Sequence, residues 1–311
     1  MKTEWYFQLS LIVVAAIFFS GCSELKNGSQ AMNPVLVDVH QEGFKSLSSP
    51  DFHGNAIQKA GWEMRDCRQC HGGSYTGSNA PSCVSAGCHV DANGTPKNPE
   101  SCNTCHGTFS GMADDTLSWT PPGSISGDTA TSARGVGAHQ FHLIAANMDL
   151  SNVVACNSCH RVPSNVYDQG HFDSPALVSF VNQLAKVPSG GMTPSPTYDA
   201  QSLTCNNTYC HGNWRLQKSN SAHQFVYTDS VISGANFAPQ WTGGDTQDAC
   251  GTCHGLPPAG HLSQGITIAQ CGYCHYVTNQ FDLVDGSGAI VNKSKHVNGK
   301  INVYGSEQAF R

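Results

Sequence analysis

The sequence predicts an irregular, loop-rich fold with few short helices and little sheet, whose interior is filled by bound groups rather than by apolar side chains. Three observations lead to this prediction. The 311 residues include 32 glycines and 15 prolines, which interrupt almost every periodic pattern. Only 12% of the residues are charged and 39% are hydrophobic. Cysteine and histidine each occur 15 times, which is unusual for a globular chain of this size.

Fourteen of the cysteines are paired by spacing, and a histidine follows the second cysteine of every pair. C-x-x-C-H is the attachment sequence for c-type haem, because each thiol adds to one vinyl group and the histidine then lies under the iron. Five pairs have this spacing: Cys67/Cys70-His71, Cys102/Cys105-His106, Cys156/Cys159-His160, Cys250/Cys253-His254 and Cys271/Cys274-His275. Two pairs are wider, C-x4-C-H: Cys83/Cys88-His89 and Cys205/Cys210-His211. The sequence therefore predicts seven covalently bound haems, with these seven histidines as proximal iron ligands.

Three other uses of paired cysteines fit the sequence less well. Disulfides would not require a histidine after every second cysteine. Structural zinc sites combine C-x-x-C pairs without an obligatory histidine each time. A thioredoxin-like redox motif would occur once, in an α/β context.

The remaining histidines are candidates for the second axial position of the irons. Methionine is the alternative axial ligand, and Met64 and Met148 are its candidates. Seven irons need seven further histidines, and eight are present, so one is spare or serves another purpose. The phrase Ala138-His139-Gln140-Phe141 recurs as Ala222-His223-Gln224-Phe225, so the spare one is either His223 or one of His139 and His142. The eight candidates are His40, His53, His139, His142, His171, His223, His261 and His296.

The N-terminus is typical of an exported chain. Residues 9–19 form an apolar run too short to span a bilayer, and small residues precede Cys22. We predict a lipoprotein signal peptide over residues 1–21, lipidation of Cys22 and a flexible tether over residues 22–37. An ordinary secretory signal with an incidental cysteine is the alternative. The net charge of −6 gives no indication of nucleic-acid binding.

An internal repeat appears when the motifs are aligned. Each copy carries one C-x4-C-H motif, two C-x-x-C-H motifs and a Pro-Pro and a His-Leu dipeptide between them, and a histidine follows the last motif. A Pro/Gly/Ser-rich segment, residues 187–197, separates the copies and is typical of a linker. We therefore expect a four-haem domain over residues 38–192 and a three-haem domain over residues 193–311. Helices are expected over Ile57–Cys70 and Gly137–Met148, and a strand or short helix over Ala176–Val187.

These residues resemble the C-x4-C-H…C-x-x-C-H multihaem c-type cytochromes of dissimilatory metal-reducing bacteria, many of which are outer-membrane lipoproteins. The resemblance implies an irregular multihaem cytochrome c fold in which the haems form the core and most irons have two histidine ligands. It supports six of the distal candidates, because they lie within shared phrases: His40, His53, His142, His171, His261 and His296. The phrases include Cys67-Arg-Gln-Cys-His-Gly72, Gly137-Ala-His-Gln-Phe-His-Leu143 and Cys250-Gly-Thr-Cys-His-Gly-Leu-Pro-Pro258.

The expected function is electron transfer, because an iron with two histidine ligands exchanges electrons without binding a substrate. The chain is accordingly expected to be an electron carrier and not an enzyme, fixed to the outer membrane on its periplasmic or cell-surface face. The resemblance implies other c-type cytochromes as donors and acceptors, with Fe(III) or Mn(IV) minerals as possible terminal acceptors. Two alternatives remain: a reductase of a small oxyanion or soluble metal at one open haem, and a cytochrome filament subunit.

Overall fold

The computed structural model describes residues 39–85, 87–147, 150–172 and 177–310. The predicted signal peptide, Cys22, the tether and Met148 lie outside these residues. The chain divides after Ala60 into two units. Among the described residues, no helix combines the length and apolar character needed to cross a bilayer.

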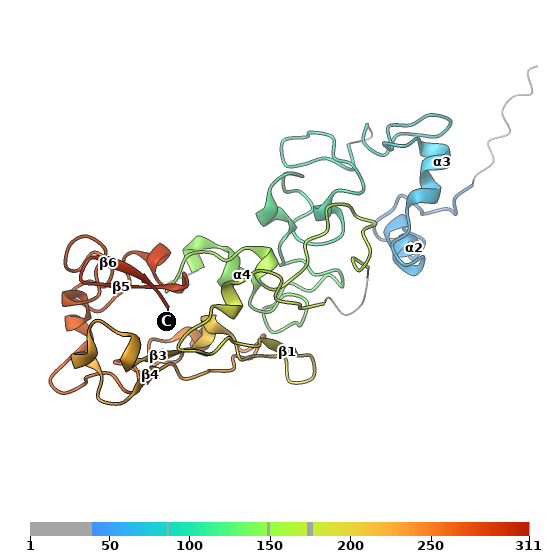
Figure 1. Cartoon of the computed structure of the whole chain (residues 1–311). Coiled ribbons are helices and arrows are strands. Elements are labelled where there is room, and N and C mark those ends of the chain that lie inside the picture. The colour runs from blue at the N-terminus through green and yellow to red at the C-terminus, as the bar shows by residue number, and fades with distance from the viewer. Residues whose placement is uncertain (1–38, 86, 148–149, 173–176, 311) are drawn as a thin grey trace, which may run out of the picture. The chain divides into compact units, whose positions relative to one another are not determined.

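The described residues form a loop-rich fold with short helices, which confirms the predicted fold class (Figure 1). The α-helices are α2 (His53–Lys59), α3 (Arg68–His71) and α4 (His139–Leu143). Short 3-10 helices begin at or include a cysteine of the haem-type motifs: η1 (Arg65–Cys67), η2 (Cys102–Thr104), η5 (Cys156–Ser158), η7 (Tyr209–His211) and η11 (Ile268–Tyr273). The other 3-10 helices are η3 (Thr116–Trp119), η4 (Ala145–Asn147), η6 (Leu184–Lys186), η8 (Lys218–Asn220), η9 (Gln224–Val226), η10 (Asp245–Asp248) and η12 (Lys293–Lys295).

The helices are shorter than the sequence predicts. The expected helix over Ile57–Cys70 is interrupted, because Gly61 and Trp62 have positive φ angles of 68° and 67° and so leave the right-handed helical region. Helix α4 lies inside the expected range Gly137–Met148 but ends at Leu143, where Ile144 becomes extended with ψ 114°. In the range Ala176–Val187, the described residues form only η6 and one bridge residue, Val178.

All named strands lie between residues 197 and 309 and form three two-stranded antiparallel sheets. They are β1 (Thr197–Asp199) with β2 (Thr204–Asn206), β3 (Arg215–Gln217) with β4 (Val231–Ser233), and β5 (Lys300–Val303) with β6 (Ser306–Ala309). The β5–β6 connection is the two-residue turn Tyr304-Gly305, with φ angles of 50° and 72°. Two positive φ angles suit the right-handed twist of a tight hairpin.

The apolar core of side chains is small. One cluster joins Leu216, Tyr227 and Ile232, and Ile301 of β5 and Phe310 pack against it. These contacts place β5 on the β3–β4 hairpin. Such a cluster is far too small for the interior of a chain of about this length, since larger domains bury most of their apolar surface.

The segment predicted to be a linker forms an ordered turn. Gly190 and Gly191 have φ angles of 50° and 75°, and Ser189 and Met192 form a bridge on either side. The turn lies on β3, because the backbone N–H of Arg215 donates to the Ser189 hydroxyl at 3.1 Å. Residues 61–311 form one unit, and the division into four-haem and three-haem domains stays a prediction.

Candidate haem-binding site

A single cavity of about 1960 Å³ runs through the unit of residues 61–311. Its walls are mainly apolar, and both cysteines of five of the seven motifs line it. Pockets for one small ligand are usually roughly 300–1,000 Å³, so this cavity has room for more than one bound group. The five motifs are those of Cys102, Cys156, Cys205, Cys250 and Cys271.

Cys88 lies outside this cavity. Its side chain is exposed, and neither Cys88 nor its partner Cys83 lines the cavity. Gly87, just before Cys88, has a φ angle of 73° that favours glycine. The first motif is similar, because Cys70 is also exposed and outside the cavity. The attachment roles of these two motifs stay a prediction.

No disulfide joins the described cysteines. Burial raises the pKa of the Cys210 thiol to about 12 and that of Cys159 and Cys205 to about 11. Thiols with such pKa values stay protonated at neutral pH, and a metal needs the thiolate. Among the described residues, no group of three or more His, Cys, Asp and Glu side chains converges as a bare metal ion requires.

Most histidines are held in one tautomer by the backbone. In the described part of the chain, eleven of the fifteen have ring atom Nδ1 within hydrogen-bond distance of a main-chain carbonyl. A carbonyl oxygen only accepts, so Nδ1 carries the proton and Nε2 keeps its lone pair. Metal-binding histidines nearly always donate their other N–H in this way. The eleven are His53, His71, His106, His139, His142, His160, His171, His254, His261, His275 and His296.

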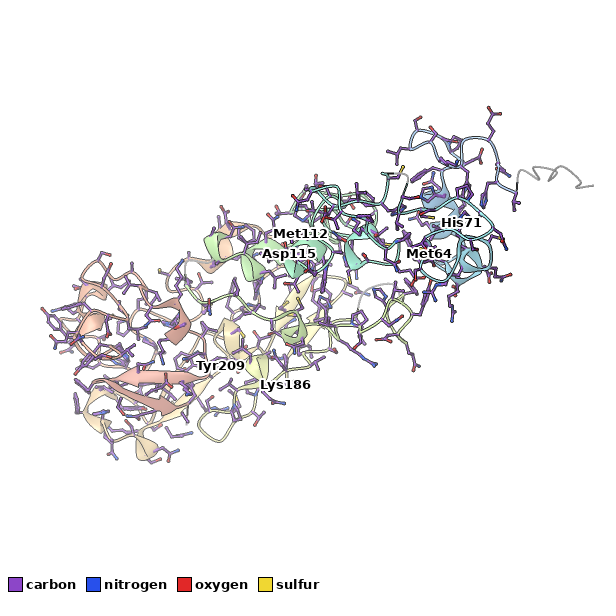
Figure 2. All side chains as sticks on the ribbon, turned by 90° about the horizontal axis from the view of Figure 1, so that it is seen from above. Met64, His71, Met112, Asp115, Lys186 and Tyr209 are labelled. Atoms are coloured by element: carbon purple, nitrogen blue, oxygen red, sulfur yellow. The ribbon has the colours of Figure 1, made fainter. Side chains whose placement is uncertain are left out.

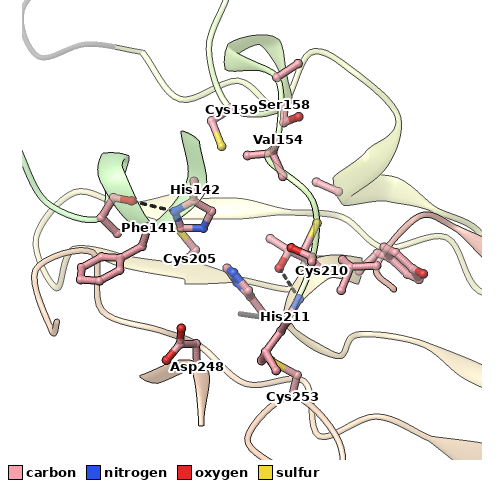
Figure 3. A pocket seen from close by; sticks show the side chains of 18 of the residues that line it. Phe141, His142, Val154, Ser158, Cys159, Cys205, Cys210, His211, Asp248 and Cys253 are labelled. Atoms are coloured by element: carbon pink, nitrogen blue, oxygen red, sulfur yellow. Dashed lines mark hydrogen bonds between the residues drawn. The ribbon is translucent and has the colours of Figure 1, made fainter. Parts of the chain in front are cut away.

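Four histidines that follow a cysteine pair each face a second histidine across the cavity. The separations of the ring centroids are nearly equal. They are 6.2 Å for His139–His160, 6.4 Å for His142–His211, 6.3 Å for His254–His296 and 6.4 Å for His261–His275. Figure 3 shows His142 and His211 entering the cavity from opposite sides, with the thiols of Cys205 and Cys210 beside them.

These separations fit two imidazoles that share one metal. A metal–imidazole bond is about 2 Å long, and each nitrogen lies about 1 Å from its ring centroid, so the two centroids would lie about 6 Å apart. Direct stacking of two rings brings their centroids closer, as in the 4.1 Å stack of His40 on Phe44. Burial also lowers the pKa of His139 and His211 to about 4. Both rings are therefore neutral at pH 7, which is the form that ligates a metal.

His171 lies close enough to His106 for its charge to affect the pKa of His106. Burial lowers the pKa of His106, and the hydrogen bond to Trp119 acts in the opposite direction. The neighbouring His171 is the third cause, and it also lowers the pKa. His106 donates Nδ1–H to the Trp119 carbonyl at 2.7 Å, and His171 donates to the Val166 carbonyl at 2.6 Å. Both histidines line the cavity.

His223 differs from the other distal candidates in this unit. Its ring lies 5.0 Å from the ring of Tyr304 and 6.2 Å from that of Phe225. Among the described ring contacts, none joins it to a histidine that follows a cysteine pair. Both His139 and His142 have such a partner, so the geometry points to His223 as the spare histidine.

The remaining predicted ligands divide between the two units. His40 and His53 belong to the unit ending at Ala60, where His53 donates Nδ1–H to the Phe44 carbonyl at 3.0 Å. His71 and His89 belong to the other unit, with the cysteines of their motifs. Their pairing stays a prediction.

Met64, the described methionine candidate, is buried at 4% exposure (Figure 2). Its carbonyl accepts a hydrogen bond from the Tyr75 hydroxyl at 3.2 Å. The methionine therefore packs beside the first cysteine pair, and its role as a ligand stays a prediction.

The two copies of the predicted repeat share local geometry at their last motif. His160 donates Nδ1–H to the carbonyl of Leu177, and His275 donates to that of Asn302. Two residues further on in each case, a backbone N–H returns a hydrogen bond of 2.8 Å to the carbonyl of the preceding cysteine: Ser179 to Cys159 and Tyr304 to Cys274. The same backbone loop thus supports the proximal histidine in both copies.

A partly buried ion pair connects the first cysteine motif with the third. Arg68, between Cys67 and Cys70, donates Nε–H to the Glu100 carboxylate at 3.0 Å, and a second guanidinium N–H also contacts it. The hydroxyls of Tyr75 and Tyr167 donate to the same carboxylate. Burial, followed by this contact with Glu100, raises the pKa of Tyr167 to about 12. Glu100 therefore holds three chain segments together near Cys102.

Sequence reasoning missed the residues that hold the histidines. The carbonyl acceptors include Val136, Ala138 and Leu150, and nothing in a residue type marks a carbonyl as an acceptor. It also missed Trp241, whose ring contacts both His139 and His142. No motif or periodicity surrounds this tryptophan, so no signal in the sequence identifies it.

The comparisons with known proteins agree with the motifs. No curated protein and no solved structure matches the chain significantly. Residues 204–254, which contain the Cys205/Cys210-His211 and Cys250/Cys253-His254 motifs, match the family described as the Geobacter CxxxxCH...CXXCH motif. This match confirms the resemblance of the chain to the multihaem c-type cytochromes that carry this motif.

Proposed function

We propose that the chain is a seven-haem c-type cytochrome that carries electrons and has two histidine ligands at each iron. The observation that carries this proposal is the set of four histidine pairs with centroids 6.2–6.4 Å apart, each including the histidine of a cysteine motif. Covalently bound haem supplies one-electron iron chemistry when it is present. The residues of this chain determine whether a substrate could also bind at the iron.

The roles of the residues follow from their positions. The cysteine pairs provide two thioether attachments for each haem, and the adjacent histidine provides the proximal ligand. The distal histidine occupies the position that a substrate would otherwise take. Because Nδ1–H is fixed on a carbonyl in eleven histidines, Nε2 is presented to the iron without a tautomer change.

Two histidine ligands favour electron transfer over reduction of a small substrate. A reductase needs one iron with an open or exchangeable position, and the paired histidines support closed positions. Electron donation from the imidazoles also favours low reduction potentials. This suits a carrier between respiratory cytochromes and an outer acceptor, for which we propose other c-type cytochromes or Fe(III) and Mn(IV) minerals.

The proposed location is the outer membrane, on its periplasmic or cell-surface face. It rests on the apolar run and on Cys22, which would carry the lipid anchor. Stable anchoring takes more than one acyl chain, and lipidation of an N-terminal cysteine would provide this. Globomycin treatment of expressing cells, with a Cys22→Ala variant as control, tests the anchor.

The function is tested on the purified holoprotein by intact mass and by redox reactivity. Seven haem additions and rapid electron exchange with a second c-type cytochrome are the expected results. The reduced protein should not consume nitrite. A count below seven would mean that one or both of the wider motifs bind no haem. Steady turnover of nitrite would mean that the protein is a reductase and not a carrier.

A further inference from the structure

The ring of Trp241 contacts the distal histidines of two different cysteine motifs. Its centroid is 4.8 Å from that of His139, at an interplanar angle of 87°, and 6.3 Å from that of His142, at 25°. The two histidines lie one turn apart on α4, so they share a face of the helix. Across the cavity, His139 faces His160 and His142 faces His211.

Hydrogen bonds from its backbone and from its side chain hold Trp241 beside these two histidines. Its backbone N–H donates to the Leu203 carbonyl at 2.6 Å, next to β2, which carries Cys205. Its indole N–H donates to the Arg134 carbonyl at 2.9 Å, just before α4. Gln247 holds the preceding residue, because its carboxamide makes two hydrogen bonds of 2.7 Å to the backbone of Gln240.

Gly137 leaves the space in which the indole of Trp241 approaches α4. A Cβ atom on Gly137 would lie 2.0 Å from Nε1 of Trp241, and Gly137 has a φ angle of 47°. A side chain at this position would displace the ring from the helix. The close packing therefore depends on a glycine immediately before Ala138 and α4.

The indole adds to the restraint that the hydrogen bonds place on the two histidine rings. Nδ1 of His139 is held by the Val136 carbonyl at 2.7 Å and Nδ1 of His142 by the Ala138 carbonyl at 2.9 Å. Together with the Cβ–Cγ bond, each hydrogen bond sets the orientation of its ring from one edge, and the faces of the ring are left to packing. An aromatic neighbour packed against the ring restricts this orientation further, since such pairs have preferred geometries.

We propose that Trp241 is a positioning residue that sets the planes of both distal imidazoles, His139 and His142, and so tunes two haem sites together. The inference rests on the proposed function, because it takes both histidines as axial ligands. The two sites lie in different copies of the predicted repeat: His160 belongs to the last motif of the first copy, and His211 to the first motif of the second. Trp241 thus acts where the two copies meet.

The test is low-temperature EPR of the oxidised holoprotein with Trp241→Leu, alongside the unaltered protein. The angle between two axial imidazole planes determines the g anisotropy of low-spin ferric haem. A change in packing that leaves this angle unaltered would leave the g values unaltered. We expect the largest g value of two low-spin signals to shift, with the haem content unchanged. Trp241→Phe, which keeps an aromatic ring, should return both signals toward their original positions.

Phe225→Leu is the matched control. Phe225 is exposed and its ring contacts His223, which has no histidine partner among the described residues. Its EPR spectrum should be unchanged. If Trp241→Leu does not assemble with full haem content, Gly137→Ala, which would displace the indole, is scored by the same criterion.

The outcome is decided by how many haems change. Changed signals that integrate to two haems support the proposal, and changes in none, one or more than two overturn it. Failure of the proposed function is seen separately, because the unaltered protein would then lack low-spin signals of bis-histidine type.

Discussion

The same four residues, Ala-His-Gln-Phe, behave differently in two regions of the molecule. In the first region, His139 opens α4 and faces His160. In the second, His223 precedes the short helix η9 with φ −113° and ψ 54°, and its ring lies against Tyr304. The difference teaches that the phrase alone does not determine which ring its histidine contacts.

The residues after each phrase explain the difference. After Phe141 the chain continues through His142 and Leu143 as a helix. After Phe225 it reaches Tyr227, which is buried and forms a bridge with His261. Pairing with a neighbouring segment ends the helix after one turn, and the ring of His223 lies against Tyr304.

A second comparison concerns the His-Leu dipeptides of the two copies. His261-Leu262 and His142-Leu143 occupy the same place in the repeat, yet His261 faces His275 of its own copy and His142 faces His211 of the other. Within the first copy, His139 takes the place of His261 by facing His160. His142, the second histidine of α4, therefore faces a histidine of the other copy.

The largest expected effect separates His139 from His223. His139→Ala should remove a distal ligand and convert one haem from low-spin to high-spin, because its partner His160 would be left alone. His223→Ala should leave every signal unchanged. EPR of both holoproteins measures this, and a new high-spin signal in His223→Ala would mean that the two histidines have been assigned the wrong way round.

The next prediction concerns the crossing between copies. His142→Ala should open the haem of the Cys205/Cys210 motif, although His142 lies in the first copy. In a variant that lacks this haem, Cys205→Ala with Cys210→Ala, the further change His142→Ala should add no high-spin signal, whereas His139→Ala still should. An added signal from His142→Ala in that background would place His142 at another iron.

A stability effect of intermediate size is expected at Gly137. Gly137→Ala forces a left-handed residue to carry a Cβ, at a cost of roughly 1–2 kcal/mol, and drives that atom into Trp241, at a further cost of about 1–3 kcal/mol. Gly191 has φ 75° and open space around it, so Gly191→Ala carries the backbone cost alone. Thermal unfolding of the two holoproteins compares them, and equal losses would show that the indole moves aside freely.

The smallest effect is expected in the β5–β6 hairpin, for which the first copy has no described counterpart strand pair. Glu307 accepts from Lys295 at 2.6 Å and from Lys300 at 2.5 Å, and these contacts lower its pKa. A lowered pKa in the folded state contributes stability above the ordinary carboxyl pKa, and this is lost as pH falls through the folded value. Glu307→Gln should lower the melting temperature slightly at pH 7 and not at pH 2. A difference that persists at pH 2 would assign it to packing.

The sequence was sufficient to predict the loop-rich fold, and its motifs also predict haem attachment. Spacing alone identifies a cysteine pair such as Cys250/Cys253, because the haem vinyl groups are a fixed distance apart. Short-range signals also located α4. The Tyr304-Gly305 turn was missed, although a glycine between alternating residues such as those of β5 and β6 is a usable hairpin signal.

Short sequence patterns could not predict which histidines face each other. His296 faces His254, and its Nδ1 is held by the carbonyl of Leu150, far away in the chain. Such a contact depends on how the loops pack around the cavity, which no spacing encodes. The outward position of Cys88 and the contacts of Trp241 were missed for the same reason, since both depend on the path of the loops.

The most direct test of the central claim is low-temperature EPR of the oxidised, unaltered holoprotein, with haem quantified in the same sample. We predict seven haems, all low-spin. The nearly parallel pair His139–His160, at 23°, should give a rhombic signal, and the nearly perpendicular pair His254–His296, at 72°, a signal with a large maximum g value. A high-spin signal equivalent to one haem or more would contradict the claim that histidines close every iron.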